Sequence, residues 1–188
     1  GSGLFSAARV WWLFRLMGQR NIAVLDGGLP KWLADGHQTT STPPTIRDRH
    51  MTVKMEPQLS RDVTEVARAA KLGDHSIVDA RAPGRFRGED PEPREGMRAG
   101  HIPGSKNVFY KDLLQPYGTM KPATELEAIF TKAGVDLAKP AITTCGSGVT
   151  AAILSLALER IGKTDHALYD GSWSEWGMYA DLPISTGA

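Results

Sequence analysis

The chain has 188 residues, of which 41% are hydrophobic and 23% charged, and 22 Lys and Arg against 21 Asp and Glu leave a net charge of +1. This balance argues against a nucleic-acid-binding or membrane-binding protein, because no basic excess is available for phosphate contacts. The longest apolar run, 151–158, is too short to span a bilayer, and residues 4–14 show no secretory signal. Cys145 is the only cysteine, which excludes an internal disulfide and a cysteine-rich zinc site and favours a reducing compartment, the cytoplasm.

The first and last parts of the chain resemble each other. Shifting the sequence by 144 residues aligns ranges 7–36 and 151–180 without a gap, with seven identities in 30 pairs. Chance gives roughly two. Each copy predicts an apolar helix closed by glycine, a short strand (22–25 or 167–169) and an Asp-Gly turn that leads to a tryptophan. We interpret the match as an internal repeat whose first copy lacks its front, and the alternative is a chance match between two strand–turn units.

A linker and the start of a complete domain follow the first copy. Residues 37–57 are polar and broken by prolines, which predicts a linker. Ser60 is expected to cap a helix, since the apolar residues behind it have helical spacing and Gly73 ends the pattern. A strand is predicted at 76–78.

The second half of this domain continues the alternation of strands and helices. Thr124 and Glu127 form a capping-box pair in front of a helix that Gly134 ends. The β-prone run 141–144 comes next, and the helix 151–161 is apolar on more than one side, so we expect it to be buried. This order predicts an α/β fold with a parallel, helix-covered sheet.

The single cysteine lies at the point where chemistry is usually done in such sheets. Cys145 follows a strand and precedes a helix. Gly146 and Gly148 let the backbone curl so that successive N–H groups face one anion, and the helix adds its positive N-terminal end. A buried structural cysteine is the more common case. The flanking glycines favour a reactive thiol, because a buried apolar residue does not need a loop without side chains on both sides.

Four further motifs accompany this loop, and together they resemble the rhodanese superfamily, in particular its two-domain 3-mercaptopyruvate sulfurtransferases. The motifs are Cys-Gly-Ser-Gly-Val-Thr-Ala at 145–151, Gly-Arg-Phe-Arg-Gly at 84–88, Pro-Glu-Pro-Arg at 91–94, Gly-His-Ile-Pro-Gly at 100–104 and Asp-Gly-Ser-Trp-Ser-Glu-Trp at 170–176. The resemblance implies a truncated, non-catalytic rhodanese repeat at 1–36, a linker at 37–57 and a catalytic rhodanese domain at 58–188, with a mainly parallel sheet covered by helices.

The resemblance also implies the chemistry. Cys145 is expected to take a sulfur atom from a small-molecule donor as a persulfide and pass it to cyanide or to a thiol acceptor such as thioredoxin or a small thiol. Gly146, Gly148, Val149 and Thr150 would cradle the persulfide, and Ser147 would donate a hydrogen bond or relay a proton. A persulfide is an anion that needs N–H donors, so no metal and no cofactor is expected.

The side chains of the loop bear on the choice of donor. Gly146 and Ser147 are neutral, whereas relatives specific for the thiosulfate dianion are expected to have basic residues there. The sequence therefore favours 3-mercaptopyruvate, with thiosulfate as a weaker donor. The resemblance implies that Arg85 and Arg94 bind the carboxylate of 3-mercaptopyruvate, and a guanidinium can bind a carboxylate through two parallel hydrogen bonds. The alternative for these arginines is a solvated loop in which they alternate with acidic residues.

Other readings of the same scaffold are less favourable. A dual-specificity phosphatase needs an arginine after the loop, but Ala151 and Ala152 stand there, so a phosphoryl dianion would lack its counter-charge. A cysteine hydrolase needs a histidine base, and His101 lies in a turn that is structural in the family. Trp173 and Trp176 are expected to be packing residues, and Asp79 and Arg81 a structural ion pair.

Two hypotheses remain open. In the first, the chain is an enzyme that transfers sulfur from 3-mercaptopyruvate and releases pyruvate. In the second, it is an inactive fragment or a persulfide-carrying binding module, because the first domain is incomplete. The apolar residues of 1–36 require a partner surface. This surface would be a missing first-domain segment, the catalytic domain or a second copy of the chain.

Overall fold

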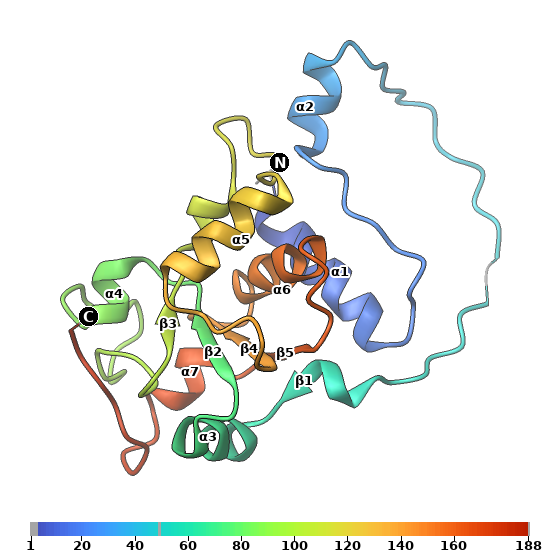
Figure 1. Ribbon diagram of the computed structural model, residues 1–188. Helices are drawn as coiled ribbons and strands as arrows, with labels where there is room; N and C mark the ends of the chain where they lie inside the picture. Colours follow the sequence, from blue (N-terminus) through green and yellow to red (C-terminus); the bar gives the residue numbers. More distant parts are fainter. Residues whose placement is uncertain (1–3, 49, 188) are drawn as a thin grey trace.

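A five-stranded parallel sheet forms the centre of the molecule in the computed structural model, which describes residues 4–48 and 50–187 (Figure 1). The spatial order of the strands is β1-β5-β4-β2-β3, and every neighbouring pair is parallel. The strands are β1 (Ser60–Arg61), β2 (Ser76–Asp79), β3 (Lys106–Asn107), β4 (Ala141–Thr144) and β5 (His166–Tyr169). The predicted α/β class with a mainly parallel sheet is confirmed.

Helices cover both faces of the sheet. They are α1 (Leu4–Leu16), α2 (Gly28–Ala34), α3 (Val63–Leu72), α4 (Pro83–Arg87), α5 (Ala123–Lys132), α6 (Ala151–Arg160) and α7 (Ser172–Trp176), with short 3₁₀ turns at Pro57–Leu59 and Tyr110–Leu113. Buried residues of α1, α5 and α6 share one apolar core, and those of α3 and α7 share another. Alternate residues of β2, β4 and β5 belong to the two cores, as Val78 and Ile77 do in β2, because successive side chains of a strand point to opposite faces.

The predicted helix starts were close, but two capping residues were wrong. Asp62, not Ser60, caps α3: its carboxylate accepts the Glu65 N–H at 2.9 Å, and the Glu65 side chain accepts the Asp62 N–H at 3.0 Å. Ser60 is paired in β1 instead. Helix α5 follows Pro122, so Thr124 lies inside the first turn and forms no capping box with Glu127. The fixed φ of proline is compatible with a helix start, which explains the displacement.

Helix α1 packs against α6, so the apolar side of the first segment rests on the domain that carries Cys145. Trp11 and Trp12 are buried in the same core as α6, while Phe14 is exposed. Arg15 of α1 forms an ion pair with Glu159 of α6 at 3.1 Å. His166 and Arg15 hold the pKa of the Glu159 carboxyl below its ordinary value, against the opposing effect of burial. Three partner surfaces were expected for the apolar residues of 1–36, and the structure shows that α1 contacts one of them, the domain that carries Cys145.

The strand predicted at 22–25 is wrong. These residues have no regular secondary structure, although Ile22 and Val24 pack against the core beside α1. A strand requires a neighbouring backbone for its hydrogen bonds, and none pairs with this segment in the described part of the chain. The 144-residue shift nevertheless relates α1 to α6 and Gly28, the start of α2, to Ser172, the start of α7. A common origin of the two copies stays a prediction.

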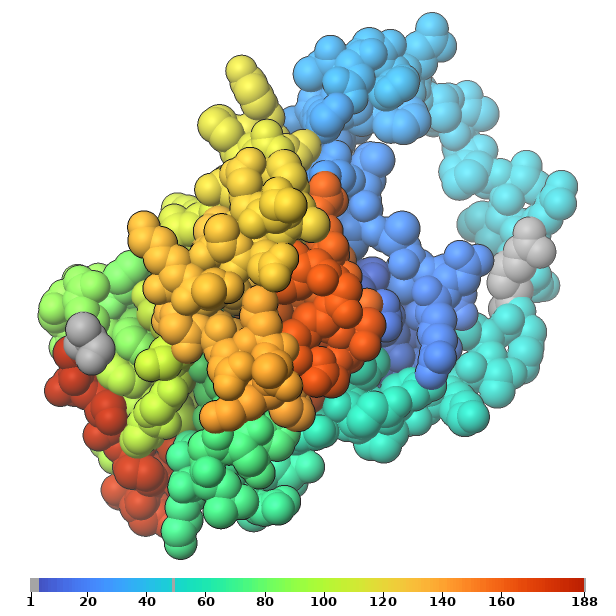
Figure 2. Space-filling model, viewed as in Figure 1, coloured from blue at the N-terminus to red at the C-terminus, as the bar shows by residue number. Residues whose placement is uncertain are grey.

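The predicted linker has no helix or strand within 37–48 or 50–56, and its side chains are mostly exposed. Figure 2 shows this segment and α2 standing off from the body of the molecule. The chain contacts the body of the molecule again at the end of α1. The Lys54 N–H donates to the Met17 oxygen (3.1 Å), and the Glu56 N–H donates to the Leu16 oxygen (2.8 Å).

Candidate active site

The loop 145–150 begins at the carboxyl end of the central strand β4 and leads directly into α6. Cys145, at its base, is buried. The loop's carbonyl groups are held from outside. The Trp173 N–H donates to the Cys145 oxygen at 2.9 Å, and both the N–H (2.9 Å) and the hydroxyl of Ser174 donate to the Gly146 oxygen. The first turn of α7 therefore fixes the start of the loop.

Holding these carbonyls also orients the N–H groups. A trans peptide places its N–H opposite its C=O, and no cis peptide occurs among the described residues. The N–H groups of Gly146 and Ser147 thus face away from α7. Within residues 4–48 and 50–187, no hydrogen bond is found from the N–H groups of residues 146–150. Five successive free donors at a helix start are suited to an anion.

Ser172 supports Cys145 from the neighbouring strand end. Its hydroxyl accepts the Cys145 N–H at 3.2 Å and donates to the Tyr169 oxygen at 2.9 Å. With φ at 52°, it is the one non-glycine residue with positive φ in the described part of the chain. Backbone strain of this kind persists where surrounding bonds enforce it, and it clusters at functional sites.

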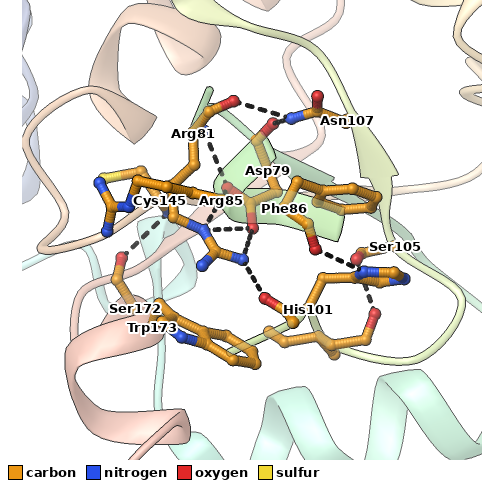
Figure 3. Close-up of polar contacts among 12 residues, drawn as sticks. Asp79, Arg81, Arg85, Phe86, His101, Ser105, Asn107, Cys145, Ser172 and Trp173 are labelled. Atoms are coloured by element: carbon orange, nitrogen blue, oxygen red, sulfur yellow. Dashed lines mark hydrogen bonds and ion pairs between the residues drawn. The ribbon is translucent and has the colours of Figure 1, made fainter. Parts of the chain in front are cut away.

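Arg85 brings a positive charge to the loop from α4. A Cβ atom at Gly146 would lie 3.3 Å from Nη2 of Arg85, so the guanidinium occupies the space that a side chain at 146 would need. Figure 3 shows it in the same part of the site as Cys145. The Arg85 side chain is 27% exposed, and its Nη2 donates to Glu92 at 2.5 Å. Its Nε is buried without a partner among the described residues.

A buried network of ion pairs holds the Arg85 side chain in place. Glu92, 1% exposed, bridges Arg85 and Arg81, whose Nη1 lies 2.8 Å away. Arg81 also donates to both carboxylate oxygens of Asp79 and to the Gly100 oxygen, with its guanidinium 4.4 Å from the Trp173 ring centroid (Figure 3). The predicted structural ion pair between Asp79 and Arg81 is confirmed. Alternating charges compensate one another, as buried ions require.

Helix α1 reaches the same loop on its outer side. Nη1 of Arg9 lies 2.5 Å from Asp170 Oδ1 and 3.5 Å from the Gly148 oxygen. Gly148 has φ at 77°, and a Cβ there would lie 2.7 Å from Asp170 Oδ1 and 3.0 Å from Arg9 Nη1. Gly148 thus meets both requirements of a glycine, a left-handed backbone and close neighbours.

The other predicted site residues lie on or near the loop with differing exposure. Ser147 is exposed at the loop, while Val149 and Thr150 are half-buried. Arg94 is exposed, and no hydrogen bond or ion pair of its side chain is found in the described ranges. The structure thus brings Arg85 to Gly146, next to Cys145, and it records no such proximity to the loop for Arg94.

The turn histidine and the tryptophans are structural, as predicted. His101 is buried, its Nδ1 lies 2.8 Å from the Phe86 oxygen, and its ring stacks on Phe86. Trp173 and Trp176 are buried, and their ring N–H groups donate to backbone oxygens.

The model of the Rhodanese-like domain family matches residues 62–179, which include the whole loop and its supports from α4 and α7. The chain belongs to the rhodanese family. Two solved structures share its fold. The Tum1 protein of Saccharomyces cerevisiae has a TM-score of 0.82 and 31% identity over 98% of this chain and 66% of that one. The 3-mercaptopyruvate sulfotransferase SseA of Escherichia coli has a TM-score of 0.79 and 39% identity over 93% of this chain and 65% of that one.

Curated relatives of this rhodanese chain have consistent names. The human 3-mercaptopyruvate sulfurtransferase is 40% identical over 95% of this chain and 60% of the relative. The mitochondrial thiosulfate/3-mercaptopyruvate sulfurtransferase 1 of Arabidopsis thaliana is 40% identical over 99% of this chain and 55% of the relative. The chain thus spans little more than half the length of these relatives.

Sequence reasoning missed several residues of this rhodanese site. Arg9, Glu92, Asp170, Ser172 and Ser174 all hold the loop or its arginine. Four of them stand in quoted motifs, Glu92 in 91–94 and the other three in 170–176, and these motifs were the available signal. Across the described ranges, no cluster of three potential metal-ligating side chains was found, nor a helix with the length and apolar character needed to cross a bilayer.

Proposed function

We propose that this chain carries the sulfur-transferring site of a 3-mercaptopyruvate sulfurtransferase, with Cys145 as the persulfide-forming residue. One observation carries the proposal: buried Cys145 is followed by five backbone N–H groups without partners in the described chain. A deprotonated persulfide has a negative outer sulfur, which such donors stabilise. The names of the curated relatives support the same donor.

The proposed reaction has two displacements. The Cys145 thiolate attacks the sulfur of 3-mercaptopyruvate, the carbon–sulfur bond breaks, and its electron pair leaves as the enolate of pyruvate, which takes a proton. The thiolate of an acceptor then attacks the outer sulfur, and Cys145 leaves as a thiolate. Ser147, exposed at the loop, is proposed to supply the hydrogen bond or proton relay for the enolate.

Arg85 is proposed to hold the donor's carboxylate, together with Arg94. The Arg85 guanidinium takes the place of a side chain at Gly146, and Glu92 occupies only one of its nitrogens. The other N–H groups of its two Nη atoms have no partner in the described chain and can bind a carboxylate. This arrangement favours a monoanionic donor over the thiosulfate dianion, since the guanidinium beside Gly146 is partly neutralised by Glu92.

The intact mass of the purified chain tests this function directly. After exposure to 3-mercaptopyruvate, the folded chain should gain one sulfur atom and release one pyruvate for each sulfur bound. Thiosulfate, as the matched donor, should give a smaller gain at equal concentration. Absence of any gain with either donor, from a chain with native circular dichroism, would reject the proposal in favour of an inactive fragment.

The carboxylate assignment predicts a donor-specific defect for Arg85→Ala. The KM for 3-mercaptopyruvate should rise by between about 10-fold and 100-fold, because a charge-assisted bidentate contact is lost, while thiosulfate turnover changes far less. Arg85→Lys should recover only part of the loss, since an ammonium cannot form the fork. Steady-state kinetics with both donors measure this. Equal losses with the two donors would refute a carboxylate contact.

The acceptor and the compartment are proposed from chemistry alone. A free thiol such as thioredoxin or a small thiol, or cyanide, would take the outer sulfur. A single cysteine that must stay reduced favours the cytoplasm, although one relative's name is mitochondrial. Transfer of labelled sulfur to each acceptor and fractionation of the source cells would test these two points.

A further inference from the structure

Arg9 links α1 to the reactive loop and to the segment that follows β5. Its guanidinium contacts the Gly148 carbonyl in the loop and the Asp170 carboxylate after β5. Asp170 directly precedes the segment whose Ser172, Trp173 and Ser174 hold Cys145 and Gly146. Arg9 therefore connects both sides of the loop to α1, a helix distant from it in sequence.

The Arg9 side chain is fixed before it reaches the loop. It is 20% exposed, and its guanidinium carbon lies 4.6 Å from the centroid of the Trp12 ring. Trp12 is itself buried, and its ring N–H donates to the Leu59 oxygen at 3.2 Å. The cation–π contact and the ion pair with Asp170 together limit the rotamers of Arg9.

The guanidinium of Arg9 contacts one edge of a peptide plane in the loop. Arg9 draws the Gly148 carbonyl toward α1, so the Val149 N–H, on the opposite edge of the same trans peptide, faces away from α1. Trp173 and Ser174 do the same for the Gly146 and Ser147 N–H groups from α7. The anion-binding donors are thus oriented by contacts on two sides.

We propose that Arg9 is a positioning residue for the loop 145–150: through Gly148 and Asp170 it keeps the backbone N–H groups turned toward the sulfur of Cys145. The inference rests on the proposed function for its consequence in sulfur transfer. Arg9 touches no reacting atom, so its effect is on the geometry of the loop. Asp170 acts with it as one unit.

The test compares Arg9→Ala with Arg15→Ala, a matched control. Both arginines lie on α1, stack on a tryptophan and pair with an acidic residue of the other domain, but Arg15 pairs with Glu159 in the last turn of α6. Arg9→Ala should lower kcat by between about 10-fold and 100-fold with little change in KM, because small displacements of catalytic groups cost rates of that size. Arg15→Ala should keep the wild-type kcat.

A second readout does not depend on sulfur transfer. The rate at which iodoacetamide alkylates Cys145 at neutral pH should fall in Arg9→Ala and stay unchanged in Arg15→Ala, because misdirected N–H groups stabilise the thiolate less. The alkylation rate should fall by a similar factor in Asp170→Asn. In the double variant, Arg9→Ala with Asp170→Asn, it should fall no further than in either single variant. Arg9→Lys should recover part of the alkylation rate, since one ammonium reaches one of the two oxygens.

The outcomes separate the two proposals. If the wild-type chain transfers no sulfur but Arg9→Ala alone lowers alkylation, the positioning role stands and the proposed function fails. If Arg9→Ala retains wild-type alkylation and kcat, or if Arg15→Ala loses as much of both as Arg9→Ala does, the positioning role is wrong. Melting temperatures of all variants identify a loss that comes from unfolding.

Discussion

Cys145→Ser should abolish sulfur binding completely, with no gain of mass and no pyruvate released from 3-mercaptopyruvate. The hydroxyl is nearly isosteric with the thiol. Residue 145 donates its N–H to the Ser172 hydroxyl and accepts the Trp173 N–H at its oxygen, so its own side chain takes part in neither bond. The fold should therefore persist while the nucleophile is lost. A serine hydroxyl ionises far less readily than a thiol, and within the described chain no base is bonded to this site.

The wild type supplies the control for this variant. Because Cys145 is the only cysteine, any sulfur that the wild type gains and then loses to dithiothreitol or cyanide must have been carried there. Circular dichroism and melting temperature should match between the two proteins. Pyruvate release by a folded Cys145→Ser variant above the rate without protein would contradict covalent catalysis by this thiol.

The sequence predicted the elements whose signals are local. The strands at 76–78 and 141–144 and the glycine-ended helices form as expected, since apolar periodicity and αL glycines act within a few residues. The strand at 22–25 failed because a strand depends on a neighbour elsewhere in the chain. Its sequence has the right residues, but no strand of the described structure lies beside it.

In the site, too, the features with local signals were predicted and those that depend on contacts between distant segments were not. The glycines around Cys145 indicated an anion-binding loop, because the conformational freedom of glycine acts within the loop itself. Arg9 could not be predicted, because only the packing of α1 on α6 brings it to Gly148. Glu92 belongs to the quoted motif 91–94, but the sequence does not indicate that its side chain is buried between two arginines. Sequence spacing does not indicate which of many charges will be enclosed.

The buried network beneath the site has a consequence for stability. Arg81 is tied to Asp79, Glu92 and the Gly100 oxygen, with the charged side chains almost fully enclosed. Arg81→Met keeps an apolar chain of similar length but leaves the buried Asp79 carboxylate without its cation and Glu92 with Arg85 alone. Breaking a buried pair in this way costs about 3 to 5 kcal/mol of the free energy of unfolding.

Urea unfolding measures this loss, with Arg20→Ala as the control. Arg20 also pairs with a glutamate, Glu56, at 3.1 Å, but its side chain is 77% exposed, so water replaces the contact and the midpoint should barely move. Arg81→Lys should lie between the two, because an ammonium keeps the charge without the fork that spans both carboxylates. A midpoint for Arg81→Met equal to that of Arg20→Ala would mean that Asp79 and Glu92 find other partners. Arg85, which shares Glu92, would then be the one cation left to compensate them.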